Sequence, residues 1–252
     1  MYEDFSSHIR IQFFIYYNRG DFMGIGLVGI GRMGKVLAKL LAGHGELCLF
    51  DRNIDQMNQI AEELNASTVE DLEEIVKMGT VILAVPDHEV VSCIKVFNQI
   101  QSPLIVINIA TNVAQHMLEQ MAAPHVKCIC VKFIGHADEM ALGSKPVIII
   151  NEFPADIVPQ MVEIFQGIGH VLVGRADVVH TINTIAAEKA LEGAVRIEEA
   201  LQRQGITDQS IIKSAIGQVA AGILKAYADG NLGPFAREIV QSVKNKISRG
   251  QL

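Results

Sequence analysis

The chain has 252 residues, which is enough for one large domain or two modest ones. Half of the residues are hydrophobic, and the formal net charge of −7 argues against a broad surface for nucleic-acid phosphates. No apolar run reaches the ~18 residues that a transmembrane helix needs, so we expect no membrane partner. The cysteines stand in apolar runs without C-x-x-C spacing, as reduced core thiols of a cytoplasmic protein do; they are Cys48, Cys93, Cys128 and Cys130.

The first 22 residues differ from the rest of the chain. They contain an unusual share of the aromatic residues, at Phe13, Phe14, Tyr16 and Tyr17. Their acidic start and short apolar run do not make a signal peptide. We expect residues 1–22 to be an extra N-terminal tail, because Met23 stands just before the first predicted strand.

A glycine-rich turn follows that strand. The apolar run 25–28 leads into it, and the amphipathic segment 35–41 comes after it, which is the context in which G-x-G-x-x-G indicates a dinucleotide site. Gly29 would make the tight turn, Gly31 would let the backbone approach a pyrophosphate, and Gly34 would let the helix pack on the strand. Free N–H groups of the helix would hold the phosphates, whereas the alternative is a glycine loop without a ligand. The expected cofactor-binding residues here are Gly29, Ile30, Gly31, Arg32, Met33 and Gly34.

The next strand, 46–50, ends at an acidic residue. Asp51 lies 22 positions after Gly29 (51 − 29), where a carboxylate would bind the hydroxyls of the adenosine ribose. This favours NAD, because a carboxylate repels a 2′-phosphate. NADP remains the alternative, since the guanidinium of Arg52 can stack on adenine or pair with that phosphate.

Further apolar runs alternate with helical periods as far as about Gly174. This pattern is typical of a Rossmann-type, doubly wound α/β domain with a mostly parallel sheet and helices on both faces. The predicted strands are 24–28, 46–50, 80–85, 104–108, 126–132, 146–150 and 170–173, and the predicted helices are 32–43, 54–64, 70–77, 88–99, 112–121 and 154–166.

After Gly174 the sequence predicts helices alone, at 177–204, 209–228 and 234–247. We therefore expect a dinucleotide-binding domain at 23–174 and a helical substrate and dimerisation domain at 175–252. Three helices of this size bury a thin core, so they would gain by packing on a second copy of themselves. The predicted partner is a homodimer through these helices; the alternative is that they wrap their own nucleotide domain.

Residues 23 to about 250 resemble the superfamily of 6-phosphogluconate dehydrogenase, β-hydroxyacid dehydrogenases, pyrroline-5-carboxylate reductase and prephenate dehydrogenase. The glycine turn, Phe50-Asp51-Arg52, Ala84-Val85-Pro86 and Asn108-Ile109-Ala110-Thr111 carry the likeness. The resemblance implies a Rossmann domain followed by a helical dimerisation domain. It also implies that Val85, Pro86 and Thr111 border the cofactor, with Thr111 in a loop near the nicotinamide.

Two later stretches bear on the chemistry. The segment from Phe133 to Gly143 resembles the substrate loop of β-hydroxyacid dehydrogenases, and this places Gly135 and His136 at the substrate. The start of the long helix resembles the same family's pattern of a glycine, a catalytic lysine and an asparagine three residues later. Here His180 stands at the lysine position and Asn183 keeps its place.

Histidine suits proton transfer because its unperturbed pKa is ~6.5, and the amide of Asn183 would orient the substrate. The alternative is a polar helix start with His180 on the surface. Lys132, at the end of a predicted strand, is a second candidate for proton transfer. The alternative is that Lys132 is an ordinary lysine in solvent. The histidines show no ligand spacing such as H-x-x-x-H, so we expect no metal site.

The pyrroline-5-carboxylate reductase pattern is incomplete. That family carries Gly-Ser-Gly-Pro at the start of the long helix, where this chain has His180 to Thr184. Its Pro-Gly-Gly-Thr-Thr segment is replaced by Leu232 to Arg237. Arg237 would meet an anionic substrate across a dimer interface, or it is a surface arginine.

The sequence thus predicts an NAD(P)-dependent oxidoreductase. It would transfer hydride between nicotinamide and a small, carboxylate-bearing substrate, either a hydroxy acid/keto acid pair or an imine. One alternative is a pyrroline-5-carboxylate reductase-like imine reductase. The other is a nucleotide-binding sensor or partner-binding protein without turnover, which the missing lysine makes credible.

Overall fold

The computed structural model describes residues 24–250, so the predicted tail at 1–22 lies outside the described residues. The chain divides into two compact units between Asn183 and Thr184. The division falls inside a long helix, because the first turns of this helix pack on the first unit: Val179 is buried in its core, and Asn183 donates a hydrogen bond to the Phe133 carbonyl.

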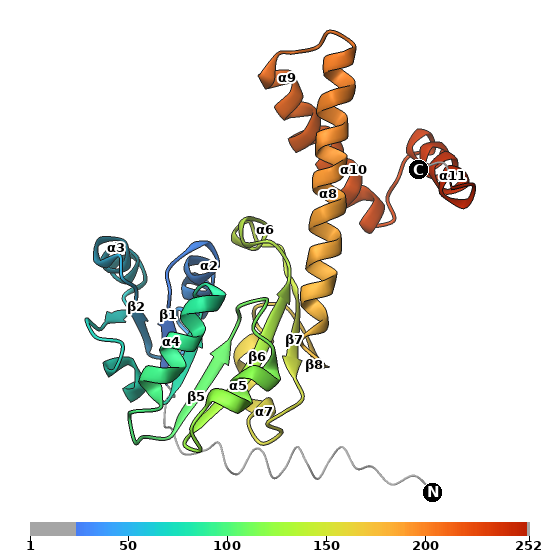
Figure 1. Cartoon of the computed structure of the whole chain (residues 1–252). Helices are drawn as coiled ribbons and strands as arrows, with labels where there is room; N and C mark the ends of the chain where they lie inside the picture. The colour runs from blue at the N-terminus through green and yellow to red at the C-terminus, as the bar shows by residue number, and fades with distance from the viewer. Residues whose placement is uncertain (1–23, 251–252) are drawn as a thin grey trace, which may run out of the picture. The chain divides into compact units, whose positions relative to one another are not determined.

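The first unit contains an eight-stranded sheet with the order β3-β2-β1-β4-β5-β6-β7-β8 (Figure 1). All neighbouring strands are parallel except β6 and β7, which are antiparallel, so the predicted mostly parallel sheet is confirmed. The strands are β1 (Ile25–Val28), β2 (Leu47–Phe50), β3 (Ser67–Thr68), β4 (Thr80–Leu83), β5 (Leu104–Asn108), β6 (Val126–Ile134), β7 (Val147–Asn151) and β8 (His170–Gly174).

Helices cover both faces of this sheet, which confirms the doubly wound fold. One face packs on α2 (Arg32–Leu41), α3 (Ile54–Leu64), α6 (Ala137–Ala141) and α7 (Val158–Phe165). The other face packs on η1 (Glu74–Met78), α4 (Asp87–Phe97) and α5 (Gln115–Met121), with Val179 of α8. The central strands are buried on both sides, and this explains why their sequences are continuously apolar.

Three local predictions differ from the structure. The segment 70–77 forms only the 3₁₀ turn η1, and the two-residue strand β3 is too short to leave an apolar pattern. The third difference is α6, a five-residue helix inside the segment predicted as a substrate loop. His136 is its N-cap residue and Met140 its buried anchor, so this segment is more regular than its glycines suggested.

The remaining helices are α8 (Val178–Arg203), α9 (Gln209–Ser214), α10 (Ala221–Ala228) and α11 (Pro234–Ser248). Between α9 and α10 lies the π-helical segment η2 (Ala215–Ala220). Asp208 caps α9 by accepting hydrogen bonds from the backbone N–H groups of Ser210 and Ile211. Among residues 24–250, no helix combines the length and the apolar composition needed to span a bilayer.

Candidate functional site

The glycine turn lies between β1 and α2. Gly29 has φ +95°, a backbone conformation that favours glycine. A side chain at Gly34 would overlap with the carbonyl oxygen of Gly29, so only glycine lets α2 start this close to the strand. A Cβ at Gly31 would meet nothing within 4 Å, which leaves the space beside the turn open. Two of the glycines therefore shape the turn, and the third leaves it accessible.

Asp51 is fixed against this turn. Its Oδ2 accepts a hydrogen bond from the backbone N–H of Ile30 at 2.5 Å, and its Oδ1 accepts one from Asn53 N–H at 2.8 Å. Gln56, on α3, donates its side-chain amide to the Ile30 carbonyl. Each carboxylate oxygen of Asp51 keeps a further lone pair for a ribose hydroxyl. No sequence pattern marks Gln56, because its contact with the turn depends on where α3 packs.

The other predicted cofactor residues lie at the same edge of the sheet. Val85 and Pro86 follow β4, and a Cβ at Gly29 would lie 2.8 Å from the Val85 side chain. Arg32 is exposed at the start of α2, and Met33 is half-buried against the core. Because β1, β2, β4 and β5 are parallel, their carboxyl ends bring these segments together where open α/β sheets bind ligands.

The loop that follows β5 is held by buried polar groups. The side chain of Asn108 accepts a hydrogen bond from Ala110 N–H at 3.0 Å and donates one to the Val113 carbonyl at 3.1 Å. Gln115 accepts from Cys130 N–H and donates to the Cys128 carbonyl, and this anchors the end of the loop on β6. Thr111, at the tip, is exposed.

Lys132 is not a solvated lysine. It is 1% exposed, and its Nζ donates to the carbonyl oxygens of Ala110 and Val113, the second at 3.0 Å. Burial lowers the pKa of this ammonium, while Cys130 and the carboxylate of Asp177 act in the opposite direction. The solvated alternative was wrong because the neighbouring loop turns two carbonyls inward, and a long amine reaches them. Lys132 therefore anchors the loop that carries Thr111.

The residues predicted for catalysis lie at the start of α8. His180 is exposed, and Asn183 is half-buried and donates its amide to the Phe133 carbonyl at 3.0 Å. This bond ties the helix start to the strand that leads to Gly135. His136 is exposed, with its Nδ1 3.8 Å from the carboxylate of Asp138. The structure thus brings Asn183 close to the predicted substrate loop, and leaves the imidazole of His180 open to solvent.

Arg237 lies in the second compact unit, near the start of α11. Its Nε donates to the Leu232 carbonyl at 2.7 Å, and the side chain is exposed. One of its donors is therefore used within its own turn, and the rest of the guanidinium faces outward.

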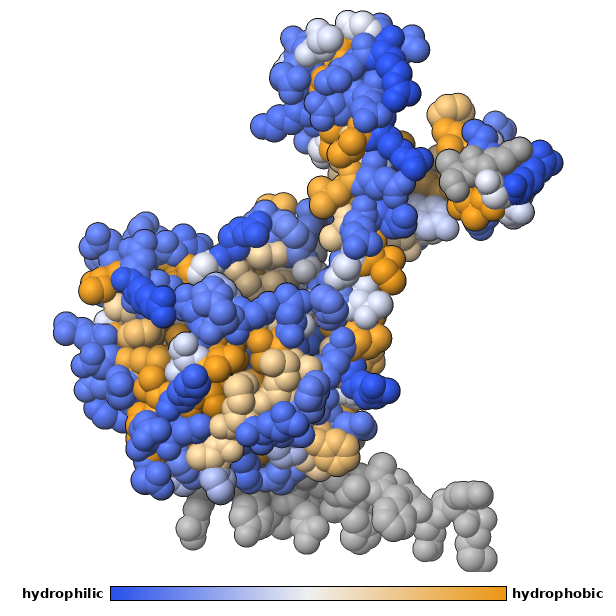
Figure 2. Space-filling view, viewed as in Figure 1, coloured by the Kyte–Doolittle hydropathy of each residue, from blue (hydrophilic) through white to orange (hydrophobic). Residues whose placement is uncertain are grey.

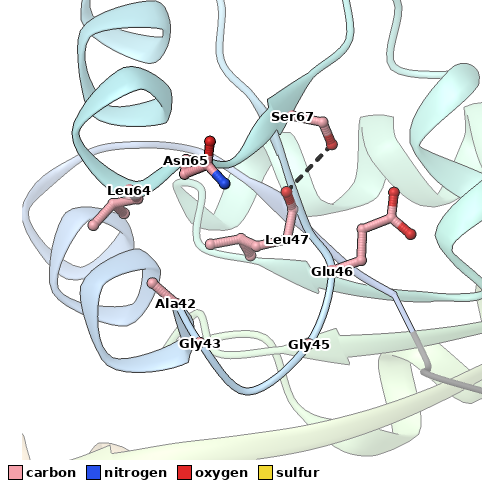
Figure 3. Close-up of a pocket in the computed structure, with 8 residues that line it drawn as sticks. All are labelled: Ala42, Gly43, Gly45, Glu46, Leu47, Leu64, Asn65 and Ser67. Atoms are coloured by element: carbon pink, nitrogen blue, oxygen red, sulfur yellow. Dashed lines mark hydrogen bonds between the residues drawn. The ribbon is translucent and has the colours of Figure 1, made fainter.

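A cavity of about 500 Å³ lies elsewhere on the first unit (Figure 3). It is lined by the carboxyl ends of α2 and α3 and by the starts of β2 and β3, where the Ser67 hydroxyl donates to the Leu47 carbonyl. This is the amino edge of the sheet, opposite to the glycine turn. We therefore do not assign the cofactor to this cavity.

Residues 24–112 match the family model described as "NADP oxidoreductase coenzyme F420-dependent". No curated protein matches the chain. Residues 24–112 of the first unit are therefore similar in sequence to part of an oxidoreductase family. The match covers every predicted cofactor residue from Gly29 to Thr111.

Solved structures resemble the chain over most of its length. A pyrroline-5-carboxylate reductase from Coxiella burnetii has a TM-score of 0.64 at 15% identity, covering 87% of this chain and 84% of that one. An imine reductase from Myxococcus stipitatus in complex with NADP+ has a TM-score of 0.64 at 14% identity, covering 91% and 78%. Its V8 variant in complex with NAD+ has a TM-score of 0.60 at 13% identity, covering 90% and 77%.

The chain has the fold of these reductases. The resemblance inferred from the glycine turn and the later motifs is thereby confirmed at the level of fold, with a Rossmann domain followed by a helical region. Sequence identities near 15% show that the fold is shared and do not identify the substrate.

Proposed function

We propose that the protein is an NAD(P)-dependent oxidoreductase that transfers hydride between the nicotinamide and a small, carboxylate-bearing substrate. The observation that carries this proposal is the open glycine turn with Asp51 hydrogen-bonded to its backbone. The family model over residues 24–112 and the reductases of the same fold support it. Among those reductases, imine reductases are frequent, and they favour a C=N substrate over a keto acid.

In this proposal, different residues of the first unit bind different parts of the cofactor or order the loop beside it. The N–H groups at the start of α2 would hold the pyrophosphate, and Asp51 would bind the ribose hydroxyls. When bound there, the nicotinamide would supply the hydride. Lys132 and Asn108 keep the loop around Thr111 in one conformation beside it, which lowers the cost of ordering the site.

His180 and Asn183 provide the remaining step. The side chain of His180 would give a proton to the nitrogen or oxygen atom of the substrate as the carbon receives the hydride. Asn183 positions the helix start through the Phe133 carbonyl, so that the segment from Gly135 to His136 faces the substrate. Arg237 is proposed to pair with the substrate carboxylate from the second subunit of a dimer.

The proposal is tested by mixing the protein with NADH or NADPH and a panel of cyclic imines, keto acids and semialdehydes, and following nicotinamide absorbance. We expect turnover of a carboxylate-bearing imine. His180→Ala should lower kcat by about 10²–10⁴-fold, the usual contribution of general acid catalysis, with nucleotide affinity unchanged. Full activity of His180→Ala would remove it as the proton donor.

Nucleotide binding with no turnover of any compound would favour the sensor alternative. The chain lacks the lysine of the β-hydroxyacid pattern, and His180 is exposed, so this alternative has a structural basis. A reductase that follows the pyrroline-5-carboxylate pattern would instead reduce the five-membered cyclic imine fastest in the panel.

We further propose that the protein is a homodimer formed through its C-terminal helices. Of the described residues of the second unit, 184–250, only Ile212 is buried in the isolated chain. Large apolar side chains on its helices are exposed, as the orange atoms on α8 and α11 illustrate (Figure 2). A helical unit of this size needs a partner surface to bury them.

The cytoplasmic location predicted from the sequence also stays a proposal. It is supported by four free, buried cysteines. Free thiols persist in reducing compartments, whereas oxidising ones favour disulfides.

A further inference from the structure

An ion pair crosses the end of β1. In the strand order, β2 and β4 flank β1, so the segments that follow them face each other across the glycine turn. Arg52 follows β2, and Glu89 lies in the first turn of α4, after β4. The Nη1 atom of Arg52 lies 3.1 Å from Oε1 of Glu89. The pair therefore spans the place where the adenosine end of a dinucleotide binds in this fold.

The two side chains of this ion pair differ in how exposed they are to solvent. The side chain of Glu89 is 23% exposed, whereas that of Arg52 is 75% exposed. Glu89 is also fixed at a helix N-terminus, where the helix dipole favours a carboxylate. His88 is the other basic group at this carboxylate, with its Nε2 3.7 Å from the same Oε1. Glu89 thus acts as the fixed partner, and Arg52 as the movable one.

We propose that Glu89 determines cofactor choice by holding the guanidinium of Arg52 away from a 2′-phosphate. Arginine binds phosphate in a forked, charge-assisted geometry, so a free Arg52 beside the ribose would favour NADPH. With Arg52 paired to Glu89 and the carboxylate of Asp51 facing the ribose, NADH is preferred. This inference rests on the proposed function, since it assigns a selection step to the same nucleotide site.

The experiment measures dissociation constants of NADH and NADPH by nicotinamide fluorescence for the full chain and for Glu89→Gln. Glutamine keeps the size of the side chain and removes its charge. We expect NADPH to bind about tenfold more tightly to the variant, because one partly exposed charge pair is exchanged for another, while NADH affinity changes less than about twofold. Glu63→Gln is the matched control: Glu63 lies 4.0 Å from Lys39 on the same unit, and its loss should change neither constant.

The role of Arg52 is tested in a double-mutant cycle. In an Arg52→Gln background, Glu89→Gln should no longer improve NADPH binding. If the gain persists there, Glu89 acts through its own charge and the inference is wrong. Equal gains for both nucleotides, or no gain at all, would also overturn it. If the parent chain binds neither nucleotide, the proposed function fails first, and this outcome is distinct from an unchanged preference.

Discussion

At the scale of single residues, two glycines of the turn should affect different properties: Gly34 the stability of the fold, and Gly31 the binding of the nucleotide. Gly34→Ala places a Cβ against the Gly29 carbonyl, which belongs to the backbone and cannot rotate away. We expect a loss of about 1–3 kcal/mol in the free energy of unfolding, the usual cost of overpacking. Gly31→Ala meets open space, so its melting temperature should stay unchanged while nucleotide affinity falls. Thermal melts and fluorescence titration of both variants measure this difference; equal melting temperatures would contradict the first part.

The buried thiols give the stability a pH dependence. Burial raises the pKa of Cys128 to about 12 and that of Cys93 to about 11. The unfolded thiol ionises at ~8.5, so above this pH the unfolded chain loses protons that the folded chain keeps. The two buried thiols contribute their full stabilisation below that pH, and this contribution is lost as the pH rises through the pKa that each thiol has in the folded chain. Each thiol therefore lowers the unfolding free energy by about 1.4 kcal/mol per pH unit in this window.

Urea unfolding between about pH 9 and pH 11 measures this slope. Cys128→Ala removes one thiol, so the variant should show a shallower decline than the parent, on top of a cavity cost that does not depend on pH. Lys132 has the opposite effect, because its lowered pKa makes stability rise with pH. Since the parent and the variant both contain Lys132, its contribution cancels when their slopes are compared. Identical slopes for parent and variant would refute the assignment to Cys128.

At the scale of elements, the loop after β5 depends on one buried ammonium. Lys132→Met removes the donor to the Ala110 carbonyl, whereas the Val113 carbonyl still accepts from Asn108; an unsatisfied buried carbonyl costs ~1–3 kcal/mol. Removing the desolvated charge offsets part of this cost, so we expect little change in global stability. Amide hydrogen exchange in 109–114 should accelerate by about tenfold, as the loop opens locally. Lys127→Met, an exposed position on the same strand, should leave that exchange unchanged.

The contrast between predicted and unpredicted elements has a physical basis. Val81 to Leu83 and Leu104 to Ile107 are apolar because both faces of their strands are buried, and such runs are visible in a sequence. The strand β3 and the helix α6 are too short for any period to show. Lys132 could not be placed from its type alone, because its burial depends on carbonyl groups that only the folded loop turns inward.

At the scale of the whole molecule, parallel topology explains why the sequence could place the proposed cofactor residues at one edge of the sheet and could not place the proposed substrate residues. Gly29, Asp51 and Val85 follow strands whose carboxyl ends share one edge, so their sequence order fixes their neighbourhood. His180 and Arg237 belong to α8 and α11, which follow the sheet in the chain, and the role proposed for Arg237 depends on a second copy of the protein. Their pairing needs tertiary and quaternary contacts that no spacing encodes.

The exposed face of the second unit leads to a prediction of assembly. Leu191, Leu224 and Phe235 are 66%, 60% and 76% exposed in the isolated chain. Burying an apolar surface of this kind against a second copy would remove it from water, and we expect a dimer in sedimentation equilibrium at micromolar concentration. Leu224→Glu should raise the dissociation constant by about a hundredfold or more, because an unpaired carboxylate in an interface costs several kcal/mol.

Gln218→Glu is the matched control, since it adds the same charge at an exposed polar position six residues earlier (224 − 218). It should leave the dimer intact. Loss of the dimer should also reduce turnover, because Arg237 then lacks a second subunit on which to act. A parent chain that stays monomeric at all concentrations and still reduces its substrate would show that the apolar helices are covered within one chain.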